Sequence, residues 1–448
     1  MVRVSFSDCN SLLYNFVAKN IHYWSDKCVI PIGTVKPYFH YIIDGVLDIP
    51  MSDIVVIPFE NVDTPLTQRD SFNVLSLAGS GDGKGLLQKL GWSVLADAGF
   101  FIVYVDPKSF DASRAKVGWN SEKLAPYMVA KGINLAPYVP VSSIDKIPHL
   151  AHNFRKYSMK ISSLHKRDFW IGLGMSQTAA SVTAKLIQGR YNGGSADFVG
   201  VKLDSLFNLR KALVIISRDH DDELPKITLG NAIRCLSMVE DFKVVTDDAR
   251  ELDMWKVWTA EKKSVVISLN NLIPQFLTFE VGFRIWESYQ YFFTHRNLPE
   301  NKPFANRPIM YFLDDAKFFA DNFDPKIVPY NFAIDQIKEI GFNYRSAGIY
   351  NWLSVQSLAI LDETAAESYP YKLISPYFKN PDSLRKINIP AKAIDYLKNN
   401  VLVKRKDIHL IQWLLIDADN AVTPFFPFTP PCNHFKPVNH PKVVGVDV

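Results

Sequence analysis

The sequence lacks the long apolar stretches that place a chain in a membrane or send it for secretion. No run of about eighteen apolar residues occurs, so the sequence predicts no membrane-spanning helix. The first residues, MVRVSFSDCNSLLYNF, carry an early aspartate and no uninterrupted apolar stretch, which makes them a poor signal peptide. We therefore expect a cytoplasmic protein, which would need something else to hold it if it worked at a membrane.

Cysteine is scarce, and the residues present are far apart. Cys9, Cys28, Cys235 and Cys432 form no CxxC pair. This spacing argues against a structural zinc site and a disulfide framework, and it fits a reducing compartment. The charge is nearly balanced as well, because 50 Lys and Arg face 46 Asp and Glu for a net charge of +4. Such a small excess neither requires nor excludes a nucleic-acid partner, since a basic stripe can lie inside a near-neutral total.

What the sequence does contain is enough apolar material for a large core. Its hydrophobic fraction of 48% and aromatic fraction of 13% are those of a globular protein. A chain of 448 residues has room for about two or three domains. The predicted parts are a small strand-rich N-terminal region (1–66), the first half of an α/β core (67–145), a helical insertion (146–254), the second half of the core (255–385), and a C-terminal helix, strands and Pro-rich tail (386–448).

The core begins with a strand, a loop, a helix and a second strand. Phe72–Leu77 is apolar, Leu86–Ala98 has helical spacing, and Phe101–Val105 is apolar again. Such a βαβ unit usually belongs to a parallel sheet that is covered on both faces. Further strands are predicted at Ser264–Leu269, Ile309–Leu313 and Ile349–Val355, with helical stretches between them. The alternation predicts an α/β fold with a mainly parallel sheet, helices on both faces and a helical insertion.

The loop after the first core strand has the composition of a phosphate-binding loop. Glycines let backbone N–H groups wrap phosphate oxygens, a lysine reaches the β- and γ-phosphates, and a Ser or Thr hydroxyl binds magnesium. The candidate nucleotide-binding residues are Gly79, Ser80, Gly81, Asp82, Gly83, Lys84 and Gly85. Ala78 stands where the first glycine belongs, and Gly85 stands where the hydroxyl belongs. Taken alone, the octet also fits a glycine-rich turn before a helix.

Two later strands end in residues that suit the same site. The strand Ile309–Leu313 ends in Asp314 and Asp315, where the first carboxylate can hold magnesium and the second can position or deprotonate water. The strand Ile349–Val355 ends in Gln356, which can sense a γ-phosphate. Arg345 precedes that strand and could stabilise transition-state charge in an adjacent subunit. In isolation, each is better explained as a polar residue at a strand end or on the surface.

The order of these segments resembles the HerA/FtsK class of P-loop ATPases, which includes type IV secretion and conjugation ATPases and viral DNA-packaging motors. The strand ending in Val105-Asp106-Pro107-Lys108, the strand at 263–269, the acidic strand, and the segment from Arg345 to Ser357 follow one another as in that class. The resemblance covers residues 72–111 and 262–424.

The resemblance implies a RecA-like fold, a hexameric ring, ATP hydrolysis with Mg²⁺, and translocation of DNA. It assigns the phosphates to Lys84, the magnesium to Asp314 and the catalytic roles to Asp315, Gln356 and Arg345. The resemblance also allows a membrane or capsid protein as a partner. The protein would then lie at the periphery of a membrane or of a virion assembly. Because Gly85 lacks a hydroxyl, a non-hydrolysing or weakly nucleotide-binding scaffold protein on the same fold stays open.

The predicted insertion carries basic residues that are candidates for binding DNA phosphates. They are Arg155, Lys156, Lys160, Lys166, Arg167 and Arg190. Salt-sensitive affinity for nucleic acid would follow from such a cluster. A solvated helix face explains the first five equally well, and a plain connecting loop explains Arg190 better.

Overall fold

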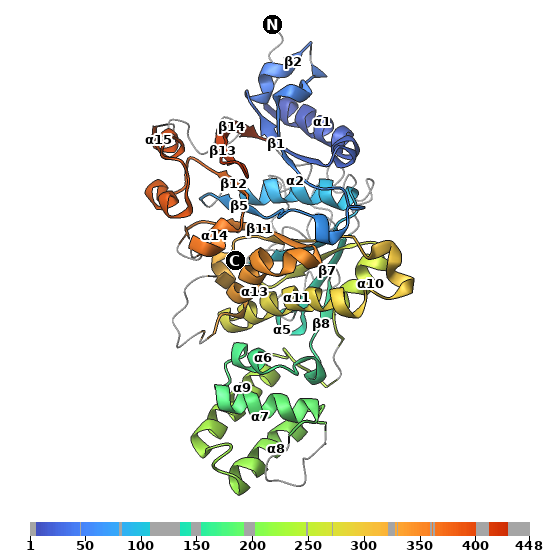
Figure 1. Cartoon of the computed structure of the whole chain (residues 1–448), viewed down its shortest axis with the longest axis vertical. Helices are drawn as coiled ribbons and strands as arrows, with labels where there is room; N and C mark the ends of the chain where they lie inside the picture. The colour runs from blue at the N-terminus through green and yellow to red at the C-terminus, as the bar shows by residue number, and fades with distance from the viewer. Residues whose placement is uncertain are drawn as a thin grey trace, which may run out of the picture.

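The computed structural model describes residues 6–44, 46–79, 83–107, 135–144, 154–191, 202–247, 250–270, 272–320, 328, 330–358, 361, 363–399 and 412–428. Figure 1 shows an α/β body with a helical lobe at the opposite end from the N-terminus. The strands are β1 (Val29–Thr34), β2 (Ile42–Ile43), β3 (Val46–Leu47), β4 (Ile54–Pro58), β5 (Val74–Leu77), β6 (Phe101–Asp106), β7 (Leu135–Pro140), β8 (Arg155–Tyr157), β9 (Ser264–Ser268), β10 (Ile309–Leu313), β11 (Ile349–Val355), β12 (Tyr371–Ile374), β13 (Trp413–Ile416) and β14 (Val422–Pro427).

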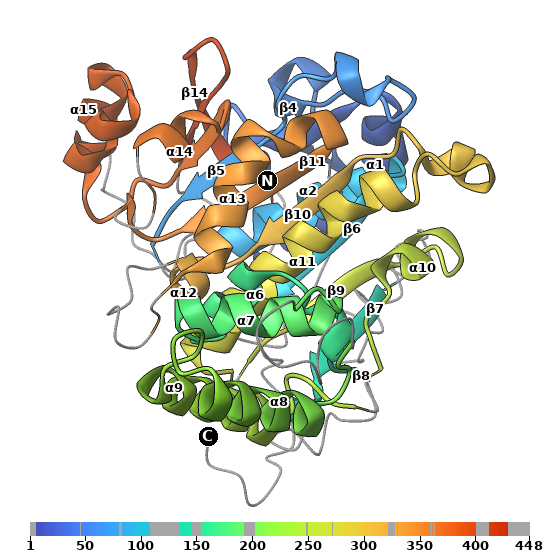
Figure 2. The ribbon, with the colours of Figure 1, turned by 60° about the horizontal axis from the view of Figure 1, so that its bottom comes forward.

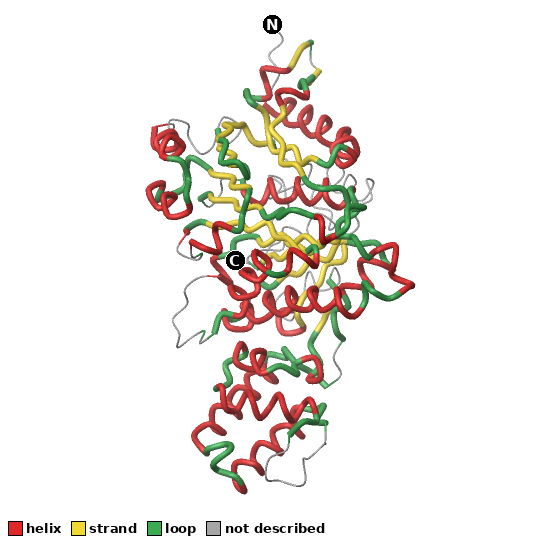
Figure 3. The backbone as a smooth tube through the Cα atoms, in the orientation of Figure 1, coloured by secondary structure: helices red, strands yellow, loops and turns green. Residues whose placement is uncertain are grey.

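The α-helices lie on both sides of these strands and in the lobe (Figure 3). They are α1 (Phe6–Asp26), α2 (Lys84–Asp97), α5 (Val141–Ile144), α6 (Arg167–Gly172), α7 (Gln177–Gln188), α8 (Leu206–Asp219), α9 (Lys226–Asp241), α10 (Met254–Thr259), α11 (Pro274–Thr294), α12 (Lys317–Ala320), α13 (Phe332–Phe342), α14 (Glu363–Glu367) and α15 (Ala391–Asn399).

One sheet runs through the body. Within the described residues it has 12 strands in the order β4-β1-β14-β13-β12-β5-β11-β10-β6-β9-β7-β8. From β12 to β8 every neighbouring pair is parallel. From β12 back to β4 every pair is antiparallel. The carboxyl ends of the parallel strands therefore meet at one edge, which is where ligands bind in open α/β sheets.

The central strands are buried on both faces, which explains why they are continuously apolar. In β10 the alternate residues Ile309, Tyr311 and Leu313 pack with α11 and α13. Figure 2 shows these two helices beside β10. The residues between them, Met310 and Phe312, belong to a core cluster on the other face, which residues of α2 also line. This period of two follows from the pleat of a strand, which turns successive side chains to opposite faces.

The N-terminal region contains a long helix as well as strands. Its first described element is the 21-residue helix α1, and its strands β1 and β4 extend the main sheet next to β14. The helix buries Leu13, Val17, Ile21 and Trp24, which recur at helical spacing. That periodicity is visible in the sequence and is the signal that identifies the helix. The domain boundaries stated above stay predictions.

The described part of the predicted helical insertion contributes a strand as well as helices. The strand is β8 at the end of the sheet, so Arg155 and Lys156 lie on a strand rather than on a helix. Helices α6, α7, α8 and α9 form the lobe and enclose a core of their own. Phe279 of α11 and Phe332 of α13 pack against that core, and they join the lobe to the body. Among the described helices, none combines the length and the apolar character needed to cross a membrane.

Two glycines provide a test of how tightly α2 packs on the sheet. A Cβ on Gly91 of α2 would lie 2.4 Å from Cζ3 of Trp352 on β11. A Cβ on Gly230, exposed on α9, would meet nothing within 4 Å. We expect Gly91→Ala to lower the free energy of unfolding by about 1–3 kcal/mol because it overpacks the core. Gly230→Ala should raise it by roughly 0.5–1 kcal/mol through helix propensity.

Urea denaturation of the two variants beside the parent protein measures both changes. An unchanged midpoint for Gly91→Ala would show that α2 does not pack on β11 at this distance.

Candidate nucleotide site

The parallel register brings the predicted site residues to one edge of the sheet. Leu77 at the end of β5 pairs with Val355 at the end of β11. Leu313 at the end of β10 pairs with Leu353 of β11 and with Val105 of β6. The residues that follow these strands therefore lie side by side. They are Ala78 and Gly79, Gln356, and the pair Asp314 and Asp315. Asp106, the last residue of β6, lies at the same edge.

The loop places its lysine at the first position of α2. Gly83 precedes the helix with φ of 95°, a left-handed conformation that favours glycine. The Lys84 side chain is buried, and its Nζ donates to the carbonyl oxygens of Ala78 at 3.1 Å and Gly79 at 2.7 Å. The ammonium thus lies against the start of the loop. Ser80, Gly81 and Asp82 lie outside the described residues.

The acidic pair adopts a constrained backbone. Asp315 has φ of 44°, and its N–H donates to Oδ1 of Asp314 at 2.9 Å. A non-glycine residue in this region of conformational space costs energy and is typical of functional sites. Burial and the neighbouring charge of Asp315 raise the pKa of Asp314 above its ordinary value of 3.8, against the opposing attraction of Lys84 and Lys89. A carboxylate that is costly to ionise gains from a cation bound beside it.

Gln356 contacts the acidic pair directly. Its Nε2 donates to Oδ1 of Asp315 at 2.9 Å. Strand β11 lies between β5 and β10 in the sheet, so Gln356 stands between the loop and the two carboxylates. This contact joins residues 41 positions apart. It places the Gln356 amide where it can orient a ligand of Asp315.

Two residues of α2 belong to the site although the sequence reasoning did not single them out. Gln88 donates from Nε2 to the carbonyl oxygen of Trp352 at 2.8 Å and to that of Leu313 at 3.4 Å, so it ties the helix to both strands. Lys89 is buried, and its charge lowers the pKa of Asp314. Gln88 lies four residues after Lys84, and that helical spacing is the signal that could have identified it.

Arg345 lies at the opposite edge of the sheet. It belongs to the short 3₁₀ helix Tyr344–Ala347 that leads into β11, whereas Asp314 follows the end of the neighbouring parallel strand β10. Five residues of strand span about 16 Å. The Arg345 side chain is exposed, and its Nε donates to the carbonyl oxygen of Arg69 at 3.1 Å. Within one chain the arginine therefore cannot complete the site at the carboxyl edge.

The residues at the carboxyl edge fit a magnesium nucleotide in most respects. The left-handed Gly83, the buried Lys84 and the carboxylate of Asp314 supply the loop geometry, the cation and a metal ligand. Oε1 of Gln88 is buried and has no hydrogen-bond partner among the described residues. It is therefore an unsatisfied acceptor near the site. Gly85 supplies no hydroxyl. Mg²⁺ is commonly held by one or two carboxylates with substrate phosphates and water, so this absence does not prevent binding.

Most of the basic residues predicted to contact DNA have partners of their own. Arg155 binds Glu261 through two hydrogen bonds of 2.7 and 2.6 Å. Lys160 pairs with Glu251, and Arg167 pairs with Asp168. Nζ of Lys166 lies 4.4 Å from the centre of the Trp286 ring. Lys156 and Arg190 are exposed. The stretch is thus partly neutralised within the chain, and DNA binding by these residues stays a prediction.

Together, the sheet order and the site define a RecA-like P-loop NTPase fold, which confirms the fold class predicted from the sequence. The chain is similar to VirB4 of Thermoanaerobacter pseudethanolicus, with a TM-score of 0.51 and 14% identity over 89% of this chain and 96% of that one. It is also similar to the plasmid coupling protein TrwB in complex with the ATP analogue ADPNP, with a TM-score of 0.48 and 13% identity over 82% and 87% of the two chains.

A further similarity is to the genome packaging NTPase B204 from Sulfolobus turreted icosahedral virus 2, with a TM-score of 0.27 and 12% identity over 74% and 98% of the chains. These neighbours are P-loop ATPases of the type IV secretion or packaging kind, as the sequence resemblance predicts. At such low identities the likeness establishes the fold. No protein-family model matches the chain. No curated protein sequence matches it either.

The buried carboxyl of Asp314 gives a test of the site that needs no ligand. Its raised pKa means that the folded protein holds this proton to higher pH than the unfolded chain does. Ionisation above pH 3.8 therefore costs the folded state stability. We expect metal-free Asp314→Asn to have a higher free energy of unfolding than the parent protein at pH 8, with the difference shrinking at pH 4.

The exposed Asp204 provides the control, since Asp204→Asn removes a carboxylate outside the site. Chemical denaturation at the two pH values measures the free energies. A difference between Asp314→Asn and the parent protein that is the same at both pH values would contradict the burial of this charge.

Proposed function

We propose that the chain is an ATP-dependent DNA translocase that works as a hexameric ring. The observation that carries the proposal is the group at the carboxyl edge. Lys84 and Asp314 stand on either side of the strand that ends in Gln356, and Gln356 is bonded to Asp315. A cation, a metal ligand, a second carboxylate and a polar sensor at one sheet edge are the parts that phosphoryl transfer from ATP to water needs.

Each residue has a separate role in this proposal. Lys84 and the loop backbone hold the phosphates, and Asp314 holds magnesium, which would neutralise phosphate charge and orient the nucleotide. Asp315 positions and deprotonates the attacking water. Gln356 fixes the rotamer of Asp315 through its hydrogen bond and contacts the γ-phosphate. Asp315 has a left-handed backbone directly after the end of β10.

Arg345 supplies the argument for the ring. It is exposed and lies at the edge of the sheet opposite the carboxylates, so it can serve only a site on another subunit. A ring of identical subunits with head-to-tail contacts brings one edge of each subunit to the other edge of its neighbour. DNA as the translocated substrate rests on the class to which the fold is similar, and a membrane or capsid partner remains part of the same proposal.

Hydrolysis of ATP by the purified protein, with and without DNA, tests the proposal. Lys84→Ala should lose activity, and Arg345→Ala should lose it by about a thousandfold, as arginine fingers do. Asp315→Asn should be inactive but folded, because asparagine tolerates the left-handed backbone found at this position. Activity of the parent protein that does not exceed that of Lys84→Ala would refute it.

Mixing the variants tests the arrangement of subunits. Arg345→Ala and Asp315→Asn should recover activity when mixed, because about a quarter of the interfaces join an intact site to an intact arginine. Lys84→Ala mixed with Asp315→Asn is the matched control, and it should recover nothing, since both residues belong to one subunit's site. Recovery in neither mixture would show that Arg345 does not act across an interface.

Gly85 favours a second candidate, a scaffold protein that keeps the fold without hydrolysing ATP. The helix α2 begins at Lys84, so residue 85 has the position from which a hydroxyl would reach the metal, and glycine provides none. On this reading, Gly85→Ser creates or raises ATPase activity, and Asp315→Ala changes nothing in the native protein. A native ATPase activity that Asp315→Ala eliminates would exclude the scaffold.

A further inference from the structure

The side chain of Arg345 is held at one nitrogen and open at the other two. Its Nε donates to the carbonyl oxygen of Arg69 at 3.1 Å, while its two Nη atoms have no hydrogen-bond partner among the described residues. The side chain is exposed at the amino edge of the parallel sheet. A planar guanidinium that is fixed at Nε can present both Nη groups to one phosphate. The orientation of this fork therefore depends on the groups that hold Arg345 and its acceptor.

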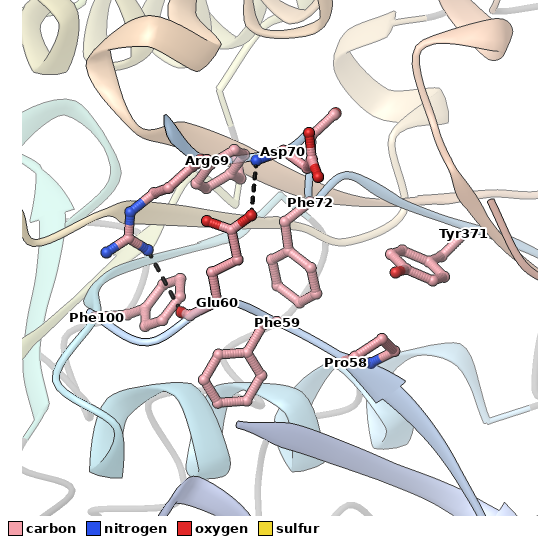
Figure 4. Close-up of a pocket in the computed structure, with 10 residues that line it drawn as sticks. Pro58, Phe59, Glu60, Arg69, Asp70, Phe72, Phe100 and Tyr371 are labelled. Atoms are coloured by element: carbon pink, nitrogen blue, oxygen red, sulfur yellow. Dashed lines mark hydrogen bonds between the residues drawn. The ribbon is translucent and has the colours of Figure 1, made fainter. Parts of the chain in front are cut away.

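Arg69, which supplies that acceptor, is itself fixed by its buried side chain. The residue is 2% exposed, and its guanidinium donates to four main-chain oxygens, which belong to Glu60, Asn61, Thr64 and Asn306. Figure 4 shows the guanidinium turned toward the main chain at Glu60. Three of these oxygens lie in the segment that leads to Arg69, and the fourth lies shortly before β10. The carbonyl that binds Arg345 is therefore tied to the start of a central strand.

A second buried arginine holds the chain on the other side of Arg345. Arg296 is 3% exposed, and it donates from Nη1 to the carbonyl oxygen of Ala347 and from Nη2 to that of Arg307 at 2.8 Å. In the described part of the chain no carboxylate pairs with Arg296, and its buried Nε has no partner. Burial and the neighbouring charge of Arg69 lower the pKa of Arg296 below its ordinary value of 12.5. A buried charge without an ionic partner costs stability, so stability alone does not account for this side chain.

The two buried arginines bind neighbouring points of the chain. Arg69 binds the carbonyl oxygen of Asn306, and Arg296 binds that of the next residue, Arg307, shortly before β10. Arg296 also binds the last residue of the 3₁₀ helix that leads into β11. Strands β10 and β11 pair in parallel from their first residues. The two guanidinium groups thus join the starts of both strands to the short helix that carries Arg345.

Tight packing fixes the same short helix on two further sides. The ring of Tyr344 stacks on that of Tyr289 of α11, with centroids 4.0 Å apart and planes at 14°. Gly348, which ends the helix, has φ of 66°, and a Cβ there would lie 2.4 Å from Cδ2 of Leu66. The main chain on both sides of Arg345 is therefore closely packed, so a shift of the segments that hold it shifts Arg345 as well.

We propose that Arg69 and Arg296 are positioning residues, which hold Arg345 so that its two Nη atoms meet the phosphates bound by a neighbouring subunit. The inference rests on the proposed function, because Arg345 has this ligand only if the ATPase site of another subunit faces it. Neither buried arginine touches the nucleotide. Each binds several carbonyl oxygens with a rigid fork of donors, which the point charge of a lysine does not reproduce. A misplacement of about 1 Å can cost about a hundredfold in rate.

Replacement of Arg296 tests the proposal through the kinetics of ATP hydrolysis by the full-length protein. Arg296→Met keeps an unbranched side chain and removes its donors. It should lower kcat by about a hundredfold and leave KM for ATP within about twofold, because Lys84 and Asp314 lie at the other edge of the sheet. Arg296→Lys should fall between Arg296→Met and the parent protein. Arg210→Met removes an arginine of the lobe that bonds to Glu240, and it should leave both constants unchanged.

Mixed subunits separate a role through Arg345 from an effect on the nucleotide site of the same subunit. Arg296→Met mixed with Asp315→Asn should recover activity, because the first supplies intact sites and the second supplies a correctly held Arg345. Arg296→Met mixed with Arg345→Ala is the matched control and should recover nothing, since neither subunit supplies such an arginine. A merely structural effect on the subunit's own site gives no recovery in the first mixture, and that result would overturn the proposal.

The outcomes distinguish this inference from the proposed function. Parent activity that does not exceed that of Lys84→Ala refutes the proposed function and this inference with it. Loss of activity in Arg345→Ala beside an unchanged kcat in folded Arg296→Met refutes this inference alone. Circular dichroism and urea denaturation measure the folded fraction of each variant. Where Arg296→Met does not fold, Arg296→Lys carries the test, and a kcat equal to that of the parent protein refutes the inference.

Discussion

Parallel pairing of β11 between β5 and β10 is the constraint on which the site depends. It aligns the ends of the three strands, so the start of the candidate phosphate-binding loop, Gln356 and the acidic pair share one edge. The same pairing sends the start of β11, with Arg345, to the other edge. A single strand is thus followed by a residue of the candidate site and preceded by an exposed arginine, as the proposed ring requires.

The charges at the carboxyl edge compensate for one another across the sheet and helix α2. Asp314 and Asp315 concentrate negative charge next to a buried strand, and Lys84 and Lys89 of α2 provide buried positive charge that opposes the raised pKa of Asp314. Gln88, between the two lysines in sequence, bonds to the ends of β10 and β11. Helix α2 is therefore bonded to β10 and β11 through Gln88, and its two lysines offset the charge of Asp314, which follows β10.

Much of the fold follows from local pattern. The apolar runs of β10 and β11 and the glycines before α2 predict their elements without knowledge of any contact. The helix α1 could also have been identified, because Leu13, Val17 and Ile21 recur at helical spacing. The joining of β1 and β4 to the main sheet could not, since it depends on pairing with β14, almost 400 residues away along the chain.

The sequence by itself determined the candidate site residues and the strands that precede them, because strand periodicity and residue type are local properties. The tertiary structure decided which of these residues meet. It joined Gln356 to Asp315, added Gln88 and Lys89 to the site, and separated Arg345 from it. It also paired Arg155 with Glu261. These outcomes depend on contacts between segments far apart in the chain, and no local pattern specifies such contacts.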